Sequence, residues 1–275
     1  MTLSTIRNNP AKQKKVKTKK QKAIAATCAV AFWLLVWHVV SLCVGSEIVL
    51  VSPVKVVQTL FTVISDPDFL KTVWYSAARI LGGFFTALTL GTVLGWVASR
   101  FWVVETLLRP ITAVIKATPV ASFIILVLLW FSGKNLSVII SMLMVFPVIY
   151  MNVLEGIRSA DKKLLEMAQV FRLSVGKKLL YIYLPAVAPF FVSACSVSLG
   201  LCWKSGIAAE VIGTPDGSIG AVFYQAKIFL QTSELLAWTV VVVAVSVAFE
   251  KLFMFLLRLV LKKLKMEDVL NGKRA

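Results

Sequence analysis

Apolar residues gather into six long runs that are separated by short polar segments. Four of these runs contain no Asp, Glu, Lys or Arg: 23–44, 80–99, 136–154 and 179–203. Two more, 111–132 and 235–257, are interrupted only by Lys116 and by Glu250 and Lys251, respectively. A helix needs ~20 apolar residues to cross the hydrocarbon core of a bilayer. The pattern therefore predicts an all-α integral membrane protein with six transmembrane helices.

The polar stretches between the runs divide the chain into predicted segments. We expect a basic cytoplasmic tail over 1–22, a first transmembrane helix over 23–44, an external amphipathic segment over 45–73, a core over 74–262 and a cytoplasmic tail over 263–275. Within the core, transmembrane helices are expected near 76–99, 109–132, 136–155, 186–209 and 234–259. A helical cytoplasmic loop over 156–185 should join helices four and five.

Glycines and prolines inside the predicted spans indicate how the helices meet. Gly91 and Gly95 form a small-xxx-small pattern, which lets two membrane helices approach closely. We expect these glycines to pack helices together, with a role in substrate passage as the alternative. Pro119 and Pro147 lie inside spans three and four and predict kinks there.

The basic residues predict the orientation of the chain. The net charge is +17, from 30 Lys and Arg against 13 Asp and Glu. With both termini in the cytoplasm, the inner segments carry 23 basic residues and the outer segments carry five. Cytoplasmic loops are enriched in Lys and Arg, so the count predicts an N-in, C-in topology. It also explains the high charge without nucleic acid as a partner.

Few ionisable or metal-binding side chains fall within the predicted spans. Arg79 either extends to the outer membrane interface or pairs with Glu210 inside the bundle. Glu210 either lines a translocation pathway or pairs structurally with Arg79 or Lys204. His38, the single histidine, is expected to be a packed or lipid-facing residue rather than a proton relay.

The four cysteines do not suggest metal or redox chemistry. Cys28, Cys43, Cys195 and Cys202 lie within or beside predicted spans. Their spacing matches no zinc or redox signature, so we expect free thiols and no metal site.

The loop over 156–185 contains the most specific pattern in the chain: Glu166-Met167-Ala168, then Arg172, then Ile182-Tyr183-Leu184-Pro185. This pattern resembles the coupling-loop signature of ABC importer permeases, which reads E-A-A, three residues, Gly, nine residues, I-x-L-P. The spacing matches at every defined position. Met167 replaces the first Ala and Arg172 replaces the Gly.

Further short motifs resemble the branch that includes aliphatic sulfonate, taurine, nitrate and bicarbonate permeases. They extend over roughly residues 51–255 and comprise Ser52-Pro53, Ser76-x-x-Arg79-x-x-x-Gly83, Thr118-Pro119, Trp130-Phe131-x-Gly133, Phe146-Pro147 and Ala209-Glu210-x-x-Gly213.

The resemblance implies a transport subunit and not an enzyme. The chain has no G-x-x-x-x-G-K-[ST] sequence, so no phosphate-binding loop of its own. ATP would bind to two separate cytoplasmic ATPase subunits, and no cofactor would bind here. The permease would work as a homodimer or beside a related permease, with an external substrate-binding protein, in a bacterial cell membrane. Glu166 would meet the ATPase groove, Ala168 would pack, and Pro185 would set the angle of span five.

A segment rich in turn residues follows span five. Gly213, Gly217 and Gly220 lie within it and predict an external loop. Its position suits contact with a substrate-binding protein or a gate.

The alternative is a self-contained secondary transporter or channel. Such a protein would need facing intramembrane charges or inverted repeats. The sequence shows few such charges and no clear repeat. A polytopic membrane enzyme would need clustered His, Asp or Glu at the bilayer surface. The substrate expected from the resemblance is a small solute of the sulfonate, nitrate or taurine class, or a related small organic molecule.

Overall fold

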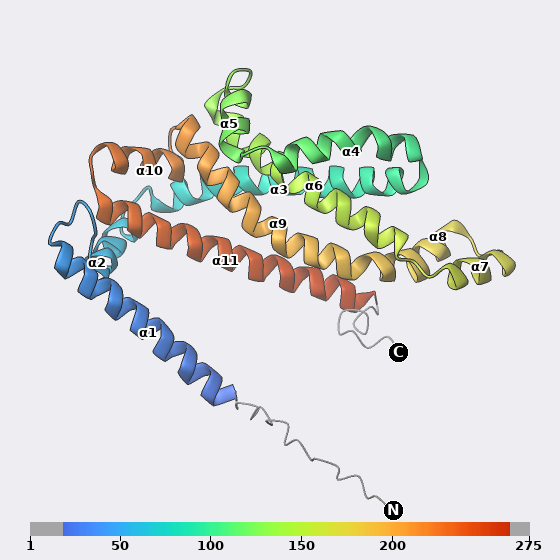
Figure 1. The fold of residues 1–275 in the computed structure, drawn as a ribbon, viewed down its shortest axis with the longest axis horizontal. Coiled ribbons are helices and arrows are strands. Elements are labelled where there is room, and N and C mark those ends of the chain that lie inside the picture. The colour runs from blue at the N-terminus through green and yellow to red at the C-terminus, as the bar shows by residue number, and fades with distance from the viewer. Residues whose placement is uncertain (1–18, 265–275) are drawn as a thin grey trace, which may run out of the picture. The chain divides into compact units, whose positions relative to one another are not determined.

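A computed structural model describes residues 19–264 as an all-helical chain with no strand (Figure 1). The chain divides into two units, residues 1–55 and 56–275. The predicted cytoplasmic tails over 1–22 and 263–275 lie almost entirely outside the described residues.

The first unit consists mainly of one long helix, α1, Lys19–Val44. The helix ends at Gly45, whose φ of +63° is a left-handed conformation that glycine adopts without a steric penalty. The Gly45 N–H donates to the Ser41 carbonyl at 3.2 Å, and the Ser41 hydroxyl donates to the Leu50 carbonyl at 3.0 Å. Trp33 is 67% exposed in the isolated chain, as expected of a helix that faces lipid.

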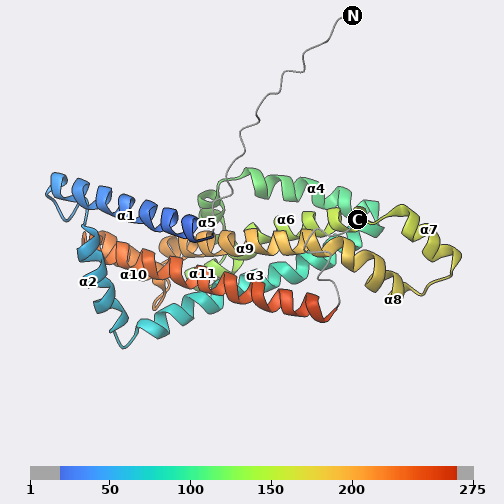
Figure 2. The same ribbon diagram turned by 90° about the horizontal axis from the view of Figure 1, so that it is seen from below.

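The second unit contains the remaining helices. They are α2 (Pro53–Ile64, which begins in the first unit), α3 (Phe69–Arg100), α4 (Trp102–Ala117), α5 (Val120–Leu128), α6 (Gly133–Arg158), α7 (Lys162–Val170), α8 (Val175–Lys178), a π-helical turn (Leu179–Tyr183), α9 (Leu184–Gly213), α10 (Ile219–Ile228) and α11 (Thr232–Lys263). Helices α7 and α8 project from one end of the bundle, while α5 and α10 lie toward the other end (Figures 1 and 2).

Five helical segments of residues 19–264 are long and apolar enough to cross a membrane, and α4 with α5 would make a sixth crossing. The kink predicted at Pro119, within the expected span near 109–132, is present as a sharp break, because α4 and α5 are separate helices bent by 106°. The break falls at Thr118, whose extended ψ of 133° is typical of a residue before proline. Pro119 therefore ends a helix. By contrast, α6 continues through Pro147.

The predicted amphipathic helix is present as α2, and one side of it packs on the protein. Val63 is buried in an apolar cluster with Ile219 of α10 and Trp238 of α11. Phe61 is 69% exposed and points away from that cluster. The α2 helix thus has one face against the bundle and a second apolar face free for a membrane interface.

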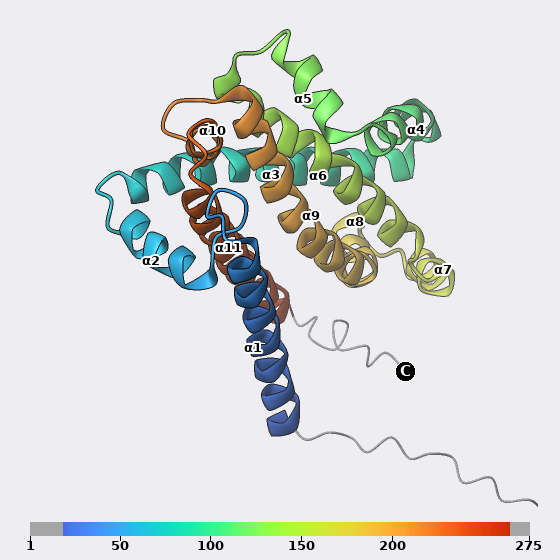
Figure 3. The ribbon, with the colours of Figure 1, turned by 60° about the vertical axis from the view of Figure 1, so that its left-hand side comes forward.

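The core of the second unit lies between α3, α6 and α9, which cross one another in Figure 3. Its buried side chains include Phe84 of α3, Ile149 of α6 and Leu199 of α9. The glycines of α3 allow this contact. A Cβ atom at Gly91 would lie 3.0 Å from the Cβ of Ile149, and one at Gly95 would lie 3.0 Å from Cγ1 of Val153. The packing role expected for these two glycines is confirmed.

Adjacent glycines on α3 provide a matched test of this packing. A Cβ at Gly83 would overlap the Val138 carbonyl and lie 2.8 Å from the Cβ of Ser141, whereas a Cβ at Gly82 would meet open space. We expect Gly83→Ala to destabilise the protein by about 1–3 kcal/mol, because α3 must move away from α6. Gly82→Ala should be neutral or stabilising by up to ~1 kcal/mol, because alanine favours helix.

The measurement is thermal unfolding of both variants in the same detergent, with wild type alongside. Equal midpoints of thermal unfolding for the two variants would show that α3 and α6 are not in close contact at Gly83.

Candidate functional site

The segment over 159–185 folds as a compact helical unit at the end of α6. Asp161 caps α7 by accepting a hydrogen bond from the Lys163 N–H at 2.8 Å, so the cap expected from the sequence is confirmed. Ala160, Ala168 and Ile182 are buried together. This apolar cluster holds α7 against the start of α9.

The motif residues of this segment divide into packed and exposed positions. Ala168 is fully buried, so a larger side chain there would not fit. Met167 is 48% exposed, which explains how it replaces a small residue without loss of packing. Glu166 is exposed on α7 and forms no ion pair within residues 19–264. Its carboxylate is therefore free for a partner outside the chain.

The closing motif joins α7 to two different helices. Ile182 packs into the cluster with Ala168. Leu184 packs with Ala188 of α9 and Leu261 of α11. Pro185 is buried near the start of α9, which continues directly from the π-helical turn, and as a proline it has no N–H to donate to the preceding turn. A displacement of α7 would therefore act on both α9 and α11.

Arg172 takes the role that the family pattern gives to glycine. Its φ is +48°, in the left-handed region. The Leu173 N–H donates to the Ala168 carbonyl at 2.9 Å, and the Arg172 N–H donates to the Gln169 carbonyl at 3.0 Å. These two bonds form a Schellman motif, in which the left-handed residue is usually glycine. The replacement thus preserves the geometry of the helix end at the expense of backbone strain.

The second constellation surrounds Glu210, which is fully buried in α9. The Ser76 hydroxyl donates to Oε2 of Glu210 at 2.7 Å, and the Gly220 N–H donates to the same oxygen at 3.3 Å. The Ile219 N–H donates to the Ser76 hydroxyl at 2.9 Å. The start of α10 is thereby tied to α3 and α9. The N-terminus of a helix carries a partial positive charge, which favours an acidic group in this position.

Of the two alternatives for Arg79, the pair with Glu210 is not formed. Arg79 instead donates to the Tyr75 hydroxyl at 2.9 Å and to the Lys134 carbonyl, with its guanidinium 4.4 Å from the centre of the Tyr75 ring. Lys204 is exposed and makes no ion pair with Glu210. Glu210 meets hydroxyl and N–H donors instead, because the α10 N-terminus occupies the space beside it.

The three glycines expected in one external loop have three different positions. Gly213 is the last residue of α9, and only Gly217 lies in the loop, with a φ of +74°. Gly220 was wrongly assigned to the loop, since it lies in α10, where a Cβ would overlap the backbone of Glu210. It is therefore a packing residue.

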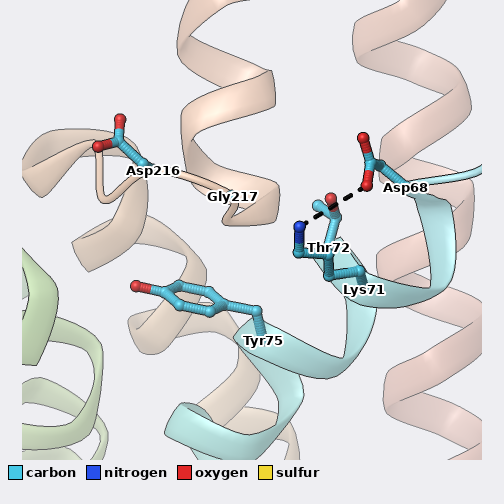
Figure 4. A pocket seen from close by; sticks show the side chains of 6 residues that line it. All are labelled: Asp68, Lys71, Thr72, Tyr75, Asp216 and Gly217. Atoms are coloured by element: carbon cyan, nitrogen blue, oxygen red, sulfur yellow. Dashed lines mark ion pairs between the residues drawn. The ribbon is translucent and has the colours of Figure 1, made fainter.

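Gly217 helps to line an open pocket of about 380 Å³. Figure 4 shows the side chains that surround it, with the exposed ion pair between Lys71 and Asp68 at 3.8 Å on one side and Asp216 on the other. Both carboxylates and the lysine are accessible at this surface. The pocket offers polar contacts to a partner at the end of the bundle opposite α7.

Sequence patterns alone did not reveal all of the polar residues that the fold brings together. Ser76 is part of a sequence motif, but no pattern in the sequence predicts its contact with Glu210. The ion pair between Arg158 and Glu105 was also missed, since 53 positions separate these residues. Within residues 19–264, no group of three His, Cys, Asp or Glu side chains could hold a metal ion, and the four cysteines are free.

Comparison with known proteins defines the class. The family described as the binding-protein-dependent transport system inner membrane component matches residues 87–266. The chain belongs to this family and is a permease subunit of the ABC-transporter kind, a multi-pass protein of the cell membrane.

Several relatives are named as permeases for aliphatic sulfonates, taurine or nitrate. The chain is 33% identical to the aliphatic sulfonates transport permease SsuC of Escherichia coli, over 78% of this chain and 82% of that protein. It is 26% identical to the taurine transport system permease TauC of Escherichia coli, over 78% of this chain and 80% of that protein. The nitrate import permease NrtB of Synechocystis is 25% identical, over 74% of this chain and 76% of that protein.

The strained helix end at Arg172 can be tested directly. Arg172→Gly should stabilise the end of α7 by about 1 kcal/mol, because glycine adopts a positive φ without the Cβ conflict. Hydrogen exchange of the Leu173 amide, which closes the motif, should become slower. Arg172→Ala is the control, since it removes the charge and keeps the strain. Equal slowing in both variants would assign the effect to charge.

Proposed function

We propose that this chain forms part of the translocation pathway of an ABC importer and couples it to a separate ATPase through residues 156–185. The observation that carries the proposal is the construction of that segment. It presents an exposed, unpaired carboxylate, Glu166, on a helix held by buried Ala168 and Ile182. It also packs through Leu184 onto α11.

The mechanism follows from this construction. A helix that is well packed on its own bundle and exposed on its outer face can be pushed as a rigid element. Closure of two ATPase subunits would move α7, and the movement would reach α9 and α11 through Ile182 and Leu184. Rigid-body movement of helices around a central path gives alternating access. The energy of ATP hydrolysis would thus drive uptake.

The basic residues support an orientation with both termini and α7 in the cytoplasm. The other end of the bundle, with Asp68, Lys71 and Asp216, would then meet an external substrate-binding protein. One such permease provides half of a pathway, so a second copy or a related permease would complete it. The substrate class is a small sulfonate, taurine-like or nitrate-like solute, in line with the relatives.

The coupling proposal is tested by Glu166→Ala in the complex purified from native membranes. We expect an ATPase subunit to co-purify with wild type, and the variant to lose about tenfold or more in ATPase affinity or hydrolysis, the scale of one charge-assisted contact. Glu47→Ala removes an exposed carboxylate outside the segment and should behave as wild type. A chain that purifies alone and transports alone would instead indicate a secondary transporter.

The role of Glu210 is tested separately by replacing its carboxyl group with an amide. We expect Glu210→Gln to impair uptake while assembly with the ATPase is intact, because the amide preserves the shape but not the charge beside the α10 N-terminus. Uptake into proteoliposomes and co-purification are measured on the same preparation. Wild-type uptake by this variant would leave Glu210 as a packing residue only.

A further inference from the structure

A pocket of about 400 Å³ lies between α4 and α6, at the end of α6 that leads into α7. Its polar lining includes Glu105 and Arg109 from α4 and Tyr150, Glu155 and Arg158 from α6. None of these residues belongs to the coupling motif or to the Glu210 constellation. The pocket has no role in the function proposed above.

The charges that line the pocket are only partly paired. Arg158 and Glu105 form an ion pair that joins the two helices. Arg109 and Glu155 line the same pocket, and neither forms an ion pair within residues 19–264. The pocket thus offers one guanidinium and one carboxylate that are not satisfied by each other.

Tyr150 adds an independent observation. Its side chain is 3% exposed and its ring stacks on Phe146 at 5.8 Å between ring centres. The buried hydroxyl oxygen has no hydrogen-bond partner among the described residues. A buried hydroxyl without a partner costs about 1–3 kcal/mol. The Thr112 hydroxyl, which lines the same pocket, donates to the carbonyls of Leu108 and Arg109.

We propose that this pocket binds a small group in which an oxyanion and an ammonium are joined by a short linker. Arg109 and the Tyr150 hydroxyl donate to the oxyanion, and Glu155 accepts from the ammonium. A simple anion would be repelled by Glu155, and a simple cation would leave Arg109 and Tyr150 unused. Only a zwitterion satisfies all three groups together.

Two sources share this chemistry. One is a free aminoalkyl sulfonate in the aqueous phase, and the other is the phosphoethanolamine headgroup of a membrane lipid. Pockets between membrane helices at the level of the headgroups are suited to either. Lys116 places its ammonium 3.5 Å from the sulfur of Met151, which lines the same pocket, and adds positive charge nearby.

The binding test uses the full chain purified in detergent and isothermal titration with three probes: taurine, ethanesulfonate and ethylammonium. The first carries both charges, and each of the others carries one. We expect taurine to bind about tenfold or more tightly than either single-charge probe, because it uses both sides of the pocket. Equal affinity for taurine and ethanesulfonate would overturn the proposal.

Single substitutions locate the site. Arg109→Gln and Tyr150→Phe should each lower the affinity for taurine by about tenfold. Glu155→Gln should abolish the preference for taurine over ethanesulfonate while ethanesulfonate binds as well or better. Arg100→Gln, an exposed arginine at the same end of the bundle and outside the pocket, is the matched control. Taurine binding that none of the three pocket variants changes would overturn the assignment.

Nanodiscs distinguish the two sources. Phosphatidylcholine, whose trimethylammonium group has no N–H donor, serves as the reference bilayer. If phosphatidylethanolamine competes with taurine and the competition is lost in Glu155→Gln, the resident ligand is the lipid headgroup. If taurine binds equally in both bilayers, the ligand is the free solute. Absence of taurine binding in both bilayers and in detergent would refute the proposal.

Discussion

The close approach of α3 to α6 at glycine positions is the constraint on which the rest of the second unit depends. Lipid tails are as apolar as the helices, so burial of apolar surface alone does little to hold membrane helices together. Close van der Waals contact at small residues and buried hydrogen bonds take its place. Gly83, Gly91 and Gly95 allow the contact with α6. The Ser141 hydroxyl, which donates to the Cys202 carbonyl at 3.2 Å, then joins α6 to α9.

Each end of these packed helices carries a different construction. At one end, Glu210 gathers α3, α9 and α10 through a serine hydroxyl and two backbone N–H groups. A carboxyl group so far from water needs donors, and helix N-termini supply them without a basic side chain. At the other end, α7 is held through an apolar cluster, with its charged face outward. The first arrangement fixes helices to one another, and the second leaves charged side chains of α7 exposed.

The segment over 159–185 connects this surface to the spans. Its contacts reach both α9 and α11, so that a displacement of α7 need not be confined to one helix. The left-handed conformation of Arg172 shows that the backbone path of this segment is maintained even where the favoured glycine is absent. Residues lining the pocket between α4 and α6 include Glu155 and Arg158, which directly precede α7. Occupancy of that pocket would thus be felt close to the same segment.

The sequence by itself determined the all-helical membrane class, the cap at Asp161 and the family, because charge-free runs and motif spacing are local properties of the chain. It predicted a kink at Pro119 but did not determine its angle of 106°. It also placed Gly220 in a loop and left open whether Arg79 pairs with Glu210. Only the tertiary structure decided those contacts, since residues more than a hundred positions apart, such as Ser76 and Glu210, meet through helix packing that no local pattern encodes.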